Sequence, residues 1–173
     1  MRVQLIRAVN VGGAKLPMAD LRDIATGLGA TDVSTYIASG NLLCSPPGDP
    51  AEFDRALEQA IAARFGYFRE VISRSPAELT ASVAAHPFAV DEAKFHHVYF
   101  LLTAPTPAQI DALLSRELPE SLAVIGRDLH ISYPPASGSA SSKLTPALIA
   151  KTLGSHGTGR NLNTVRKLIE LAS

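Results

Sequence analysis

The order of its regular elements constrains this chain most. Apolar spacing predicts strand, helix, strand, strand, helix and strand within residues 1–90, and an approximate repeat of that order within residues 91–173. This is the order of a ferredoxin-like unit, in which an antiparallel sheet carries helices packed on it. We therefore expect an α+β protein of two tightly joined ferredoxin-like halves, residues 1–90 and residues 91–173, the second with a C-terminal helix.

The first half carries the clearer signals. Strands are expected at Val3–Val9, Asp32–Ala38, Leu42–Cys44 and Glu70–Arg74, and the turn at Ser39–Asn41 makes the middle two a hairpin. Two helix faces follow from apolar residues three or four apart: Met18, Leu21, Ile24, Ala25 and Leu28, then Phe53, Leu57, Ala60, Ile61 and Phe65. A third helix is expected to open at Ser75 and Pro76.

The second half repeats this order with one gap. Strands are expected at His96–Thr103, Ser121–Ile125 and Leu129–Tyr133, and helices after Pro107, at Ser142–Leu153 and at Asn163–Ala172. Residues 154–159 are expected to form a loop. No closing strand is indicated, so we expect the terminal helix to take its place and the second half to be a modified repeat.

The charge balance argues against nucleic acid as the main partner. Lysine and arginine number 16, as do aspartate and glutamate, whereas proteins that hold phosphate backbones usually carry a basic excess. Hydrophobic residues make up 46% of the chain, which is typical of a globular protein. From Lys143 onward five bases face one acid, which marks either a solvated helix surface or a local anion site.

Cysteine use and hydropathy indicate a cytoplasmic protein. Cys44 is the only cysteine, which excludes an intramolecular disulfide and a zinc cluster of thiolates, and its apolar neighbours predict a buried, inert thiol. The amino terminus is charged at Arg2 and Arg7, too early for a secretory signal. No apolar run reaches the roughly 18 residues of a membrane helix, so no membrane contact is expected.

The first candidate site is the turn after the first strand. Arg7, Asn10, Gly12 and Gly13 occur there, with Lys15 just beyond. Successive backbone N–H groups in a glycine turn before a helix can bind an anion. The spacing matches neither a dinucleotide fingerprint nor a phosphate-binding P-loop. The alternative is a strand-to-helix turn that needs glycine only for its positive φ angle.

The second candidate site is the predicted hairpin turn. Ser39 and Asn41 flank Gly40, and their polar groups would project from one end of the sheet. Glycine and asparagine are also the residues that a tight hairpin requires for backbone reasons alone. The sequence leaves both explanations open.

The third candidate site combines two segments near the C-terminus, each expected at a helix start. They contribute Ser142 and Lys143, then Arg160, Asn161 and Asn163. Serine and asparagine cap free backbone N–H groups, and the positive end of the helix dipole favours anions. Arginine can bind a phosphate or carboxylate through two hydrogen bonds. Ordinary capping with flanking charges explains the pattern equally well.

Catalytic and metal-binding signatures are not expected, and no cofactor is predicted. Ala140 stands three residues before Lys143, so a Ser-x-x-Lys pair is missing. The histidines show no metal-ligand spacing: His86, His96, His97, His130 and His156. His96 and His97 should point to opposite faces of their strand.

In combination, these motifs resemble a bacterial family. Residues 7–13, 17–21, 36–41, 142–145 and 158–164 occur in the order of the signatures of the domain-of-unknown-function family numbered sixteen ninety-seven. The resemblance implies a stand-alone cytoplasmic protein with two ferredoxin-like halves and no established reaction. Two positions depart from the family pattern: Ala8 replaces a glycine, and Leu162 replaces an aromatic residue that could stack on a base.

Three functions from different classes follow. The leading hypothesis is a site for a small anionic ligand, such as a phosphate-bearing metabolite, built from the glycine turns, helix caps and bases. Nucleic-acid binding is the second, and it lacks both a basic excess and an aromatic strand motif. The third is a structural or interaction role, in which Arg160 and Asn161 only satisfy buried carbonyl groups.

Overall fold

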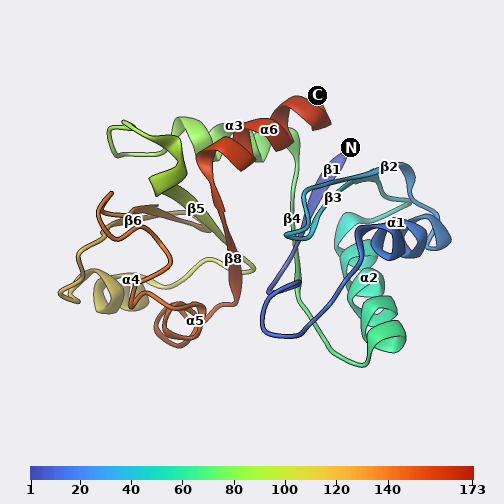
Figure 1. The fold of residues 1–173 in the computed structure, drawn as a ribbon, viewed down its shortest axis with the longest axis horizontal. Coiled ribbons are helices and arrows are strands. Elements are labelled where there is room, and N and C mark those ends of the chain that lie inside the picture. Colours follow the sequence, from blue (N-terminus) through green and yellow to red (C-terminus); the bar gives the residue numbers. More distant parts are fainter. The chain divides into compact units, whose positions relative to one another are not determined.

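The computed structural model describes residues 1–173 and contains two compact units (Figure 1). The first unit comprises Met1–Leu79 with Leu168–Ser173, and the second comprises Thr80–Lys167. The chain enters the second unit within helix α3 (Pro76–Ala84) and leaves it within helix α6 (Leu162–Ala172). Each unit contains a four-stranded antiparallel sheet and the order βαββαβ, which confirms the predicted α+β class and the repeat.

The first unit contains β1 (Arg2–Ile6), α1 (Met18–Gly27), β2 (Thr31–Tyr36), β3 (Asn41–Ser45), α2 (Pro50–Phe65) and β4 (Val71–Arg74). Its strands lie in the order β2-β3-β1-β4. The register pairs Leu5 with Asn41 on one side and with Ile72 on the other. The central strand β1 therefore ends between the β2–β3 turn and the start of β4, where the candidate site lies.

The core between this sheet and its helices follows the alternation of the strands. Ile6, Leu42, Cys44 and Val71 face α1 and α2, which lie on one side of the sheet (Figure 1). The helices contribute buried side chains at helical spacing: Leu21 and Ala25, then Phe53, Leu57 and Ile61. The predicted burial of Cys44 is confirmed, and burial raises the pKa of its thiol to about 11. This cysteine is therefore unreactive at neutral pH.

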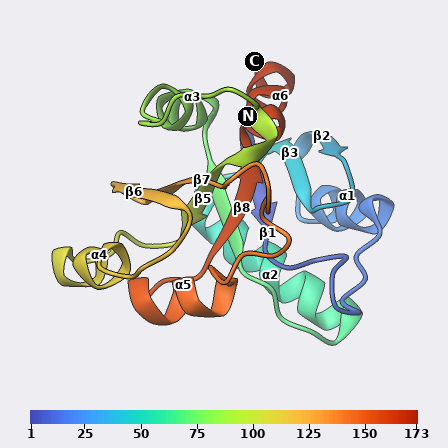
Figure 2. The ribbon, with the colours of Figure 1, turned by 60° about the vertical axis from the view of Figure 1, so that its left-hand side comes forward.

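The second unit contains β5 (His96–Leu101), α4 (Pro107–Leu114), β6 (Ser121–Ile125), β7 (Asp128–Ser132), α5 (Pro146–Leu153) and β8 (Gly157–Asn161). Its strand order, β6-β7-β5-β8, is the same as in the first unit. Figure 2 shows α4 and α5 on one face of this sheet. They bury Tyr99, Leu101, Leu129 and Ile131 from the strands.

The expected absence of a closing strand in the second half is wrong, because β8 pairs with β5 along its whole length. The strand has no large apolar residue, and its glycines are required by the neighbouring Tyr99 ring. A Cβ atom built on Gly157 would lie 2.5 Å from Tyr99 Cε1, and one on Gly159 would lie 3.1 Å from Tyr99 Cδ2. Strand β8 therefore forms through backbone pairing with β5, and its glycines leave room for the Tyr99 ring.

The predicted helix Ser142–Leu153 begins four residues too early. Helix α5 starts at Pro146, and the Thr145 hydroxyl accepts a hydrogen bond of 3.2 Å from the Leu148 N–H. Proline in the first turn after a threonine cap fixes this start. Lys143 therefore precedes the helix instead of opening it. No helix of the chain is both long enough and apolar enough to cross a membrane.

Candidate functional site

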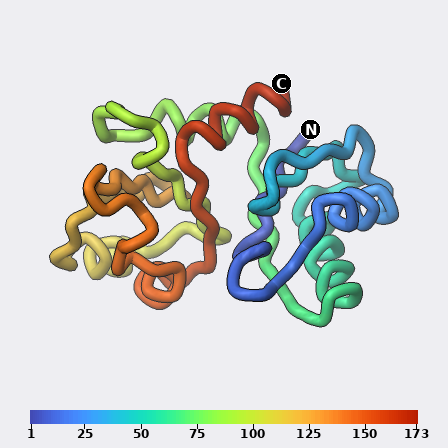
Figure 3. The backbone as a smooth tube through the Cα atoms, viewed as in Figure 1, coloured from blue at the N-terminus to red at the C-terminus, as the bar shows by residue number.

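The loop between β1 and α1, residues 7–17, has an unusual backbone and is the long blue loop of Figure 3. The left-handed region is occupied by Ala8 (φ 49°), Asn10 (φ 56°), Gly12 (φ 59°) and Gly13 (φ 92°). Only glycine adopts this conformation without steric cost, so the Ala8 backbone is strained. Ala8 is also the position at which the family resemblance expects glycine.

Asn10 fixes the shape of this loop with its side-chain amide. Its Nδ2 atom donates to the Leu16 carbonyl (3.0 Å) and to the Ala38 carbonyl (2.5 Å). Its Oδ1 atom accepts from the Leu16 N–H (2.9 Å). Both ends of the amide therefore close the loop on Leu16, and Nδ2 also ties it to the β2–β3 turn, so the amide has no donor left for a ligand.

Several backbone N–H groups at this loop have no acceptor in the protein. The loop closes on itself through Asn10 N to Ala14 O (2.7 Å) and Ala14 N to Val11 O (3.3 Å), and Gly12 and Gly13 donate no hydrogen bond. Helix α1 then begins after Pro17 without a side-chain cap. The exposed N–H groups of the loop and the uncapped helix start favour an anion at this surface, and the acid in the first turn of α1, Asp20, is paired with Arg64.

A pocket of about 460 Å³ opens at this surface. Its walls come from the loop, the start of α1 and the β2–β3 turn: Asn10, Gly13, Ala14, Lys15, Leu16, Pro17, Met18 and Ala38. The volume lies in the usual range of small-molecule sites. Lys15 is exposed and its ammonium group forms no ion pair, while its carbonyl accepts from the Tyr67 hydroxyl (2.6 Å). The pocket therefore combines apolar walls with one uncompensated cation.

Arg7 does not line this pocket. Its Nε atom lies 2.5 Å from Glu70 Oε2, and this half-buried ion pair neutralises its charge. Arg69 donates to the Ala8 carbonyl (3.1 Å), and its guanidinium lies 4.9 Å from the centre of the Tyr67 ring. Both arginines therefore brace the strained loop from the side of β4.

The β2–β3 turn, the second candidate, supplies Ala38 to the pocket and has backbone reasons for its other residues. The buried Asn41 amide donates to the Tyr36 carbonyl (2.9 Å) and to the Ser39 hydroxyl (3.0 Å). Gly40 has φ 81°, and a Cβ atom there would lie 2.6 Å from Val9 Cγ2. Glycine at this position thus lets the turn approach the first loop.

The third candidate set lies in the second unit or at its border. The Ser142 hydroxyl donates to Glu120 and accepts from the Leu144 N–H (3.0 Å), so it fixes the turn before α5. Lys143 is exposed. Asn161 accepts a hydrogen bond of 2.9 Å from the Thr164 N–H at the start of α6, and Asn163 is exposed.

Arg160 is a buried strand residue of β8, 7% exposed. Its guanidinium donates to the Thr158 hydroxyl and to the Gly159 carbonyl, both at 2.8 Å. Burial lowers the pKa of this guanidinium to about 10, so it is still charged at neutral pH. The position differs from the expected helix start because β8 extends to Asn161.

The sequence therefore identified the loop but not the pocket. Asn10 and Gly13 are pocket residues, and Gly12 lies beside them. The sequence indicates Lys15 only as a neighbour of the turn and Met18 only as part of a helix face, and it gives no signal for Leu16 as a pocket wall. No sequence signal indicates which residues of a helix start face a cavity.

Comparisons with known proteins agree with this fold and assign no activity. The sequence model of a family described as "Protein of unknown function (DUF1697)" matches residues 1–130. A solved structure described as that of conserved bacterial protein SP0830 from Streptococcus pneumoniae is similar, with a TM-score of 0.76 and 24% sequence identity. The similarity covers 99% of this chain and 98% of that one. No curated protein matches the sequence.

Proposed function

Because the chain belongs to a family described as a protein of unknown function, DUF1697, we propose a function from its geometry: the β1–α1 pocket binds a small anionic ligand. The charged group of this ligand contacts Lys15 and the N–H groups of Gly12 and Gly13. Asn10 holds the loop in its binding conformation. This proposal carries forward the phosphate-bearing ligand that the sequence suggests, and it adds Lys15 to the predicted residues.

The observation that carries the proposal is uncompensated positive charge at a preformed pocket. The Lys15 ammonium has no acidic partner, and α1 begins without a side-chain cap; the acid of its first turn, Asp20, is paired with Arg64. An anion at a helix N-terminus gains about 0.3–1 kcal/mol, and up to about 2 kcal/mol where water is partly excluded. A lysine adds a charge-assisted hydrogen bond. A phosphate or carboxylate in the pocket can interact with the helix N-terminus and with the Lys15 ammonium at the same time.

The apolar walls indicate what the rest of the ligand is. Ala14, Leu16, Pro17 and Met18 present hydrocarbon to the pocket, and free phosphate would leave these walls unused. Burial of apolar ligand surface contributes roughly 25 cal/mol per Å². We therefore propose a phosphate or carboxylate attached to an apolar or aromatic body. Equal numbers of bases and acids in the chain do not favour a nucleic-acid backbone as that anion.

The test is a thermal-shift and calorimetric comparison of three probes. Phenyl phosphate carries both features, inorganic phosphate carries only the charge, and benzyl alcohol carries only the apolar body. We expect phenyl phosphate to bind most tightly and to raise the melting temperature most. At 100 times its Kd it should add about 2.7 kcal/mol to the free energy of unfolding.

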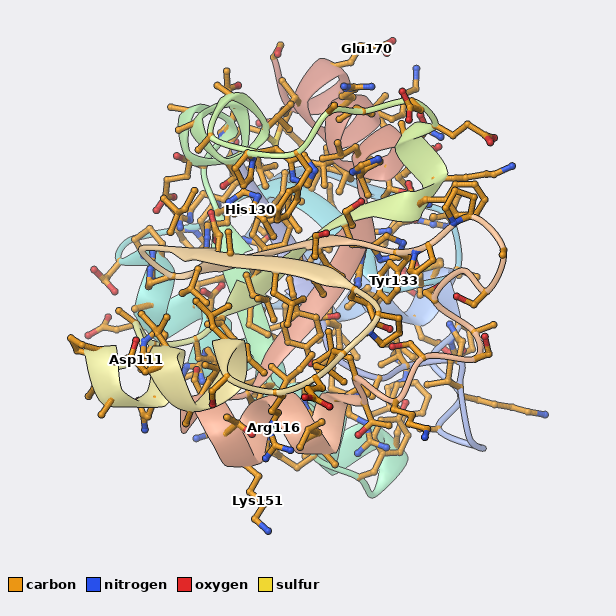
Figure 4. The ribbon with its side chains drawn as sticks, turned by 90° about the vertical axis from the view of Figure 1, so that its left-hand side faces the viewer. Asp111, Arg116, His130, Tyr133, Lys151 and Glu170 are labelled. Atoms are coloured by element: carbon orange, nitrogen blue, oxygen red, sulfur yellow. The ribbon has the colours of Figure 1, made fainter.

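Two matched variants show whether the pocket is responsible. Lys15→Gln removes the proposed cation, and Lys151→Gln removes an exposed lysine of α5 that points into solvent (Figure 4). We expect the phenyl phosphate shift to be lost in Lys15→Gln and kept in Lys151→Gln. No shift with any probe, or the same loss in both variants, would contradict the proposal and favour a purely structural role of the loop.

A further inference from the structure

Three histidines of the second unit form a hydrogen-bonded series. His86 follows α3, His96 begins β5, and His130 lies in β7. His86 Nε2 lies 3.1 Å from His96 Nδ1, and His86 Nδ1 lies 3.1 Å from His130 Nδ1. The series is therefore centred on His86, which uses both of its ring nitrogens. No group of His, Cys, Asp or Glu side chains in the chain is arranged to hold a metal ion.

The series joins a connecting segment to the sheet. Strand alternation places His96 and Val98 on one face of β5, and the register sets His130 opposite Val98 on the same face. In Figure 4, His130 lies on the side of the sheet that α3 covers. Ser82 of α3 also hydrogen-bonds Asp128 on that face. His86 thus links residues 85–95, between α3 and β5, to two strands.

The neutral series has enough protons for both of its hydrogen bonds. Each neutral imidazole has one N–H donor and one lone-pair acceptor. The two hydrogen bonds can therefore be donated from His96 towards His130 or from His130 towards His96. In both directions His130 Nε2 is left in the protein interior without a hydrogen-bond partner. His130 is 0% exposed, so water would not solvate a charge on this ring.

Only one additional proton fits into the closed series. A protonated His86 donates from both nitrogens, and both neighbouring rings must then accept through Nδ1. A second proton on either neighbour places two N–H groups face to face and breaks a hydrogen bond. Three histidines released into water bind up to three protons below their ordinary pKa of about 6.5. Between about pH 6 and 5 the closed series is still neutral, because burial lowers the pKa of His86 to about 4, so opening there takes up about two to three protons.

Burial, more than the neighbouring charges, opposes protonation of the central ring. Burial lowers the pKa of His86 to about 4, with smaller contributions from His130, His96 and Arg166 of α6. Burial also lowers the pKa of His130, although Asp128 acts in the opposite direction. The buried Arg160 lies on the same sheet face, since β8 pairs it with Val98.

A small pocket depends on the same segment. Its volume is about 100 Å³, and one side is formed by Ala89, Asp91, Glu92 and Phe95 of the connecting segment. The other side is formed by His96, Ser132, Tyr133 and Pro135. The carboxyl groups of this pocket, Asp91 and Glu92, are exposed, and Glu92 pairs with Lys94 at 2.8 Å. If residues 85–95 leave the sheet, this pocket loses one of its walls.

We propose that His86, His96 and His130 form a proton-sensitive latch, which holds residues 85–95 and the pocket they line against the second sheet and opens as the three rings take up protons. The device is independent of the proposed anion site. It converts a fall in pH below about 6 into the release of one defined segment.

Hydrogen exchange of the full chain tests the latch directly. The best reporters are the amides of Phe95, which donates to the Glu92 carbonyl within the segment, and of Tyr133, which donates to the Phe95 carbonyl; the amides of Ala85 and His86, which donate to the Ala81 and Val83 carbonyls of α3, report the start of the segment. After correction for intrinsic rates, their protection should be high at pH 7.5. Because opening takes up about two to three protons, their protection should fall by about 100- to 1,000-fold for each pH unit below 6. Amides of β1 and β4 serve as an internal reference.

Two variants separate the latch from general acid sensitivity. His86→Gln keeps a neutral donor and acceptor at the centre but removes one of the three titrating rings, so the change in protection per pH unit should be about 10-fold smaller than in wild type. His156→Gln, an exposed histidine outside the series, should behave as wild type. An identical pH response in His86→Gln, or unchanged protection between pH 7.5 and 5, would overturn the proposal.

A measurement on the wild-type protein covers the case in which His86→Gln does not fold. Nitrogen-15 spectra of the histidine rings report the protonation of each nitrogen. We expect His86 and His130 to remain neutral at pH 6 and to change together at lower pH. Independent titration of the two rings near pH 6.5 would contradict the latch.

Discussion

The β1–α1 connection of the first unit and the β5–α4 connection of the second occupy the same place in the same topology, yet they are built differently. Helix α4 begins with a complete capping box, in which Thr106 and Gln109 satisfy each other's backbone N–H groups, and Pro107 follows the cap. Helix α1 begins after Pro17 with no side-chain cap. The second connection is an ordinary helix start, whereas the first leaves its N–H groups open.

This difference identifies which features need a functional explanation. A chain that requires only a strand-to-helix turn can use five residues and a threonine cap, as residues 102–106 show. The first unit instead uses eleven residues, 7–17, with four of them in the left-handed region. Such a loop carries a conformational cost, and it lines a pocket together with Lys15.

The largest expected effect on the free energy of unfolding comes from a substitution in the β2–β3 turn, and the β6–β7 turn provides its control. Gly40→Ala adds a Cβ atom 2.6 Å from Val9 Cγ2 and 3.1 Å from the Ile6 carbonyl oxygen, in a left-handed conformation. We expect a loss of about 4 kcal/mol in the free energy of unfolding, from overpacking and backbone strain together. Gly126→Ala in the β6–β7 turn meets no atom within 4 Å and should cost only about 1 kcal/mol. Urea unfolding measures both, and equal losses would contradict the close approach of the first turn.

A slightly smaller effect is expected on the pH dependence of the free energy of unfolding, which should have opposite signs for one residue in each unit. Burial raises the pKa of Asp54, on α2, to about 6, so the stability that its protonated form contributes is complete below about pH 3.8 and is lost as the pH rises from 3.8 through 6. The lowered pKa of His86 has the opposite sign: its stability is complete above about pH 6.5 and is lost as the pH falls towards 4. Each contribution amounts to about 3 kcal/mol.

Variants of the full chain separate these two contributions. Relative to wild type, Asp54→Asn should be favoured most above pH 6, and its advantage should shrink as the pH falls. His86→Gln should gain relative to wild type as the pH falls from 6.5 to 4. Urea unfolding at a series of pH values measures both differences, and parallel curves for either variant would contradict its assignment.

A further comparison tests how each connection is held. Asn10→Ala removes three hydrogen bonds and places alanine at φ 56°, so we expect a loss of about 2 kcal/mol together with loss of phenyl phosphate binding. Thr106→Ala removes a helix cap and should cost about 1 kcal/mol without an effect on binding. Full ligand affinity in a folded Asn10→Ala protein would show that the loop conformation is not needed.

The smallest expected effect on stability belongs to Lys15. Because its ammonium group is exposed and forms no ion pair, Lys15→Gln should change the free energy of unfolding by less than about 0.5 kcal/mol. Its effect on phenyl phosphate affinity should be at least about 10-fold. A large loss of stability would show that the lysine has a structural role.

Much of the fold could be predicted from local patterns. The helical spacing from Phe53 to Phe65 depends on burial against one neighbouring sheet, so the sequence carries the signal directly. Strand β8 could not be recognised in this way. Its residues, from Gly157 to Asn161, are strand-forming only because β5 offers a backbone edge and Tyr99 covers the glycines. That information lies about 60 residues earlier in the chain.

The same limit applies to the sites. The glycine turn at Gly12 and Gly13 is a local signal and was recognised, whereas the engagement of Arg7 by Glu70 depends on the pairing of β1 with β4. The histidine series is the clearest case. Strand alternation alone separates His96 from His97, but the approach of His86 and His130 depends on strand order and on the path of α3.

The most direct test of the account is an amide chemical-shift titration of the full chain with phenyl phosphate. We predict that the largest changes occur at Gly12, Gly13 and Lys15 and in the first turn of α1, with smaller ones at Ala38. The equivalent connection of the second unit, residues 102–109, should not change. Absence of changes in the first loop, or equal changes in both connections, would contradict the claim that the first unit departs from an ordinary helix start in order to bind an anion.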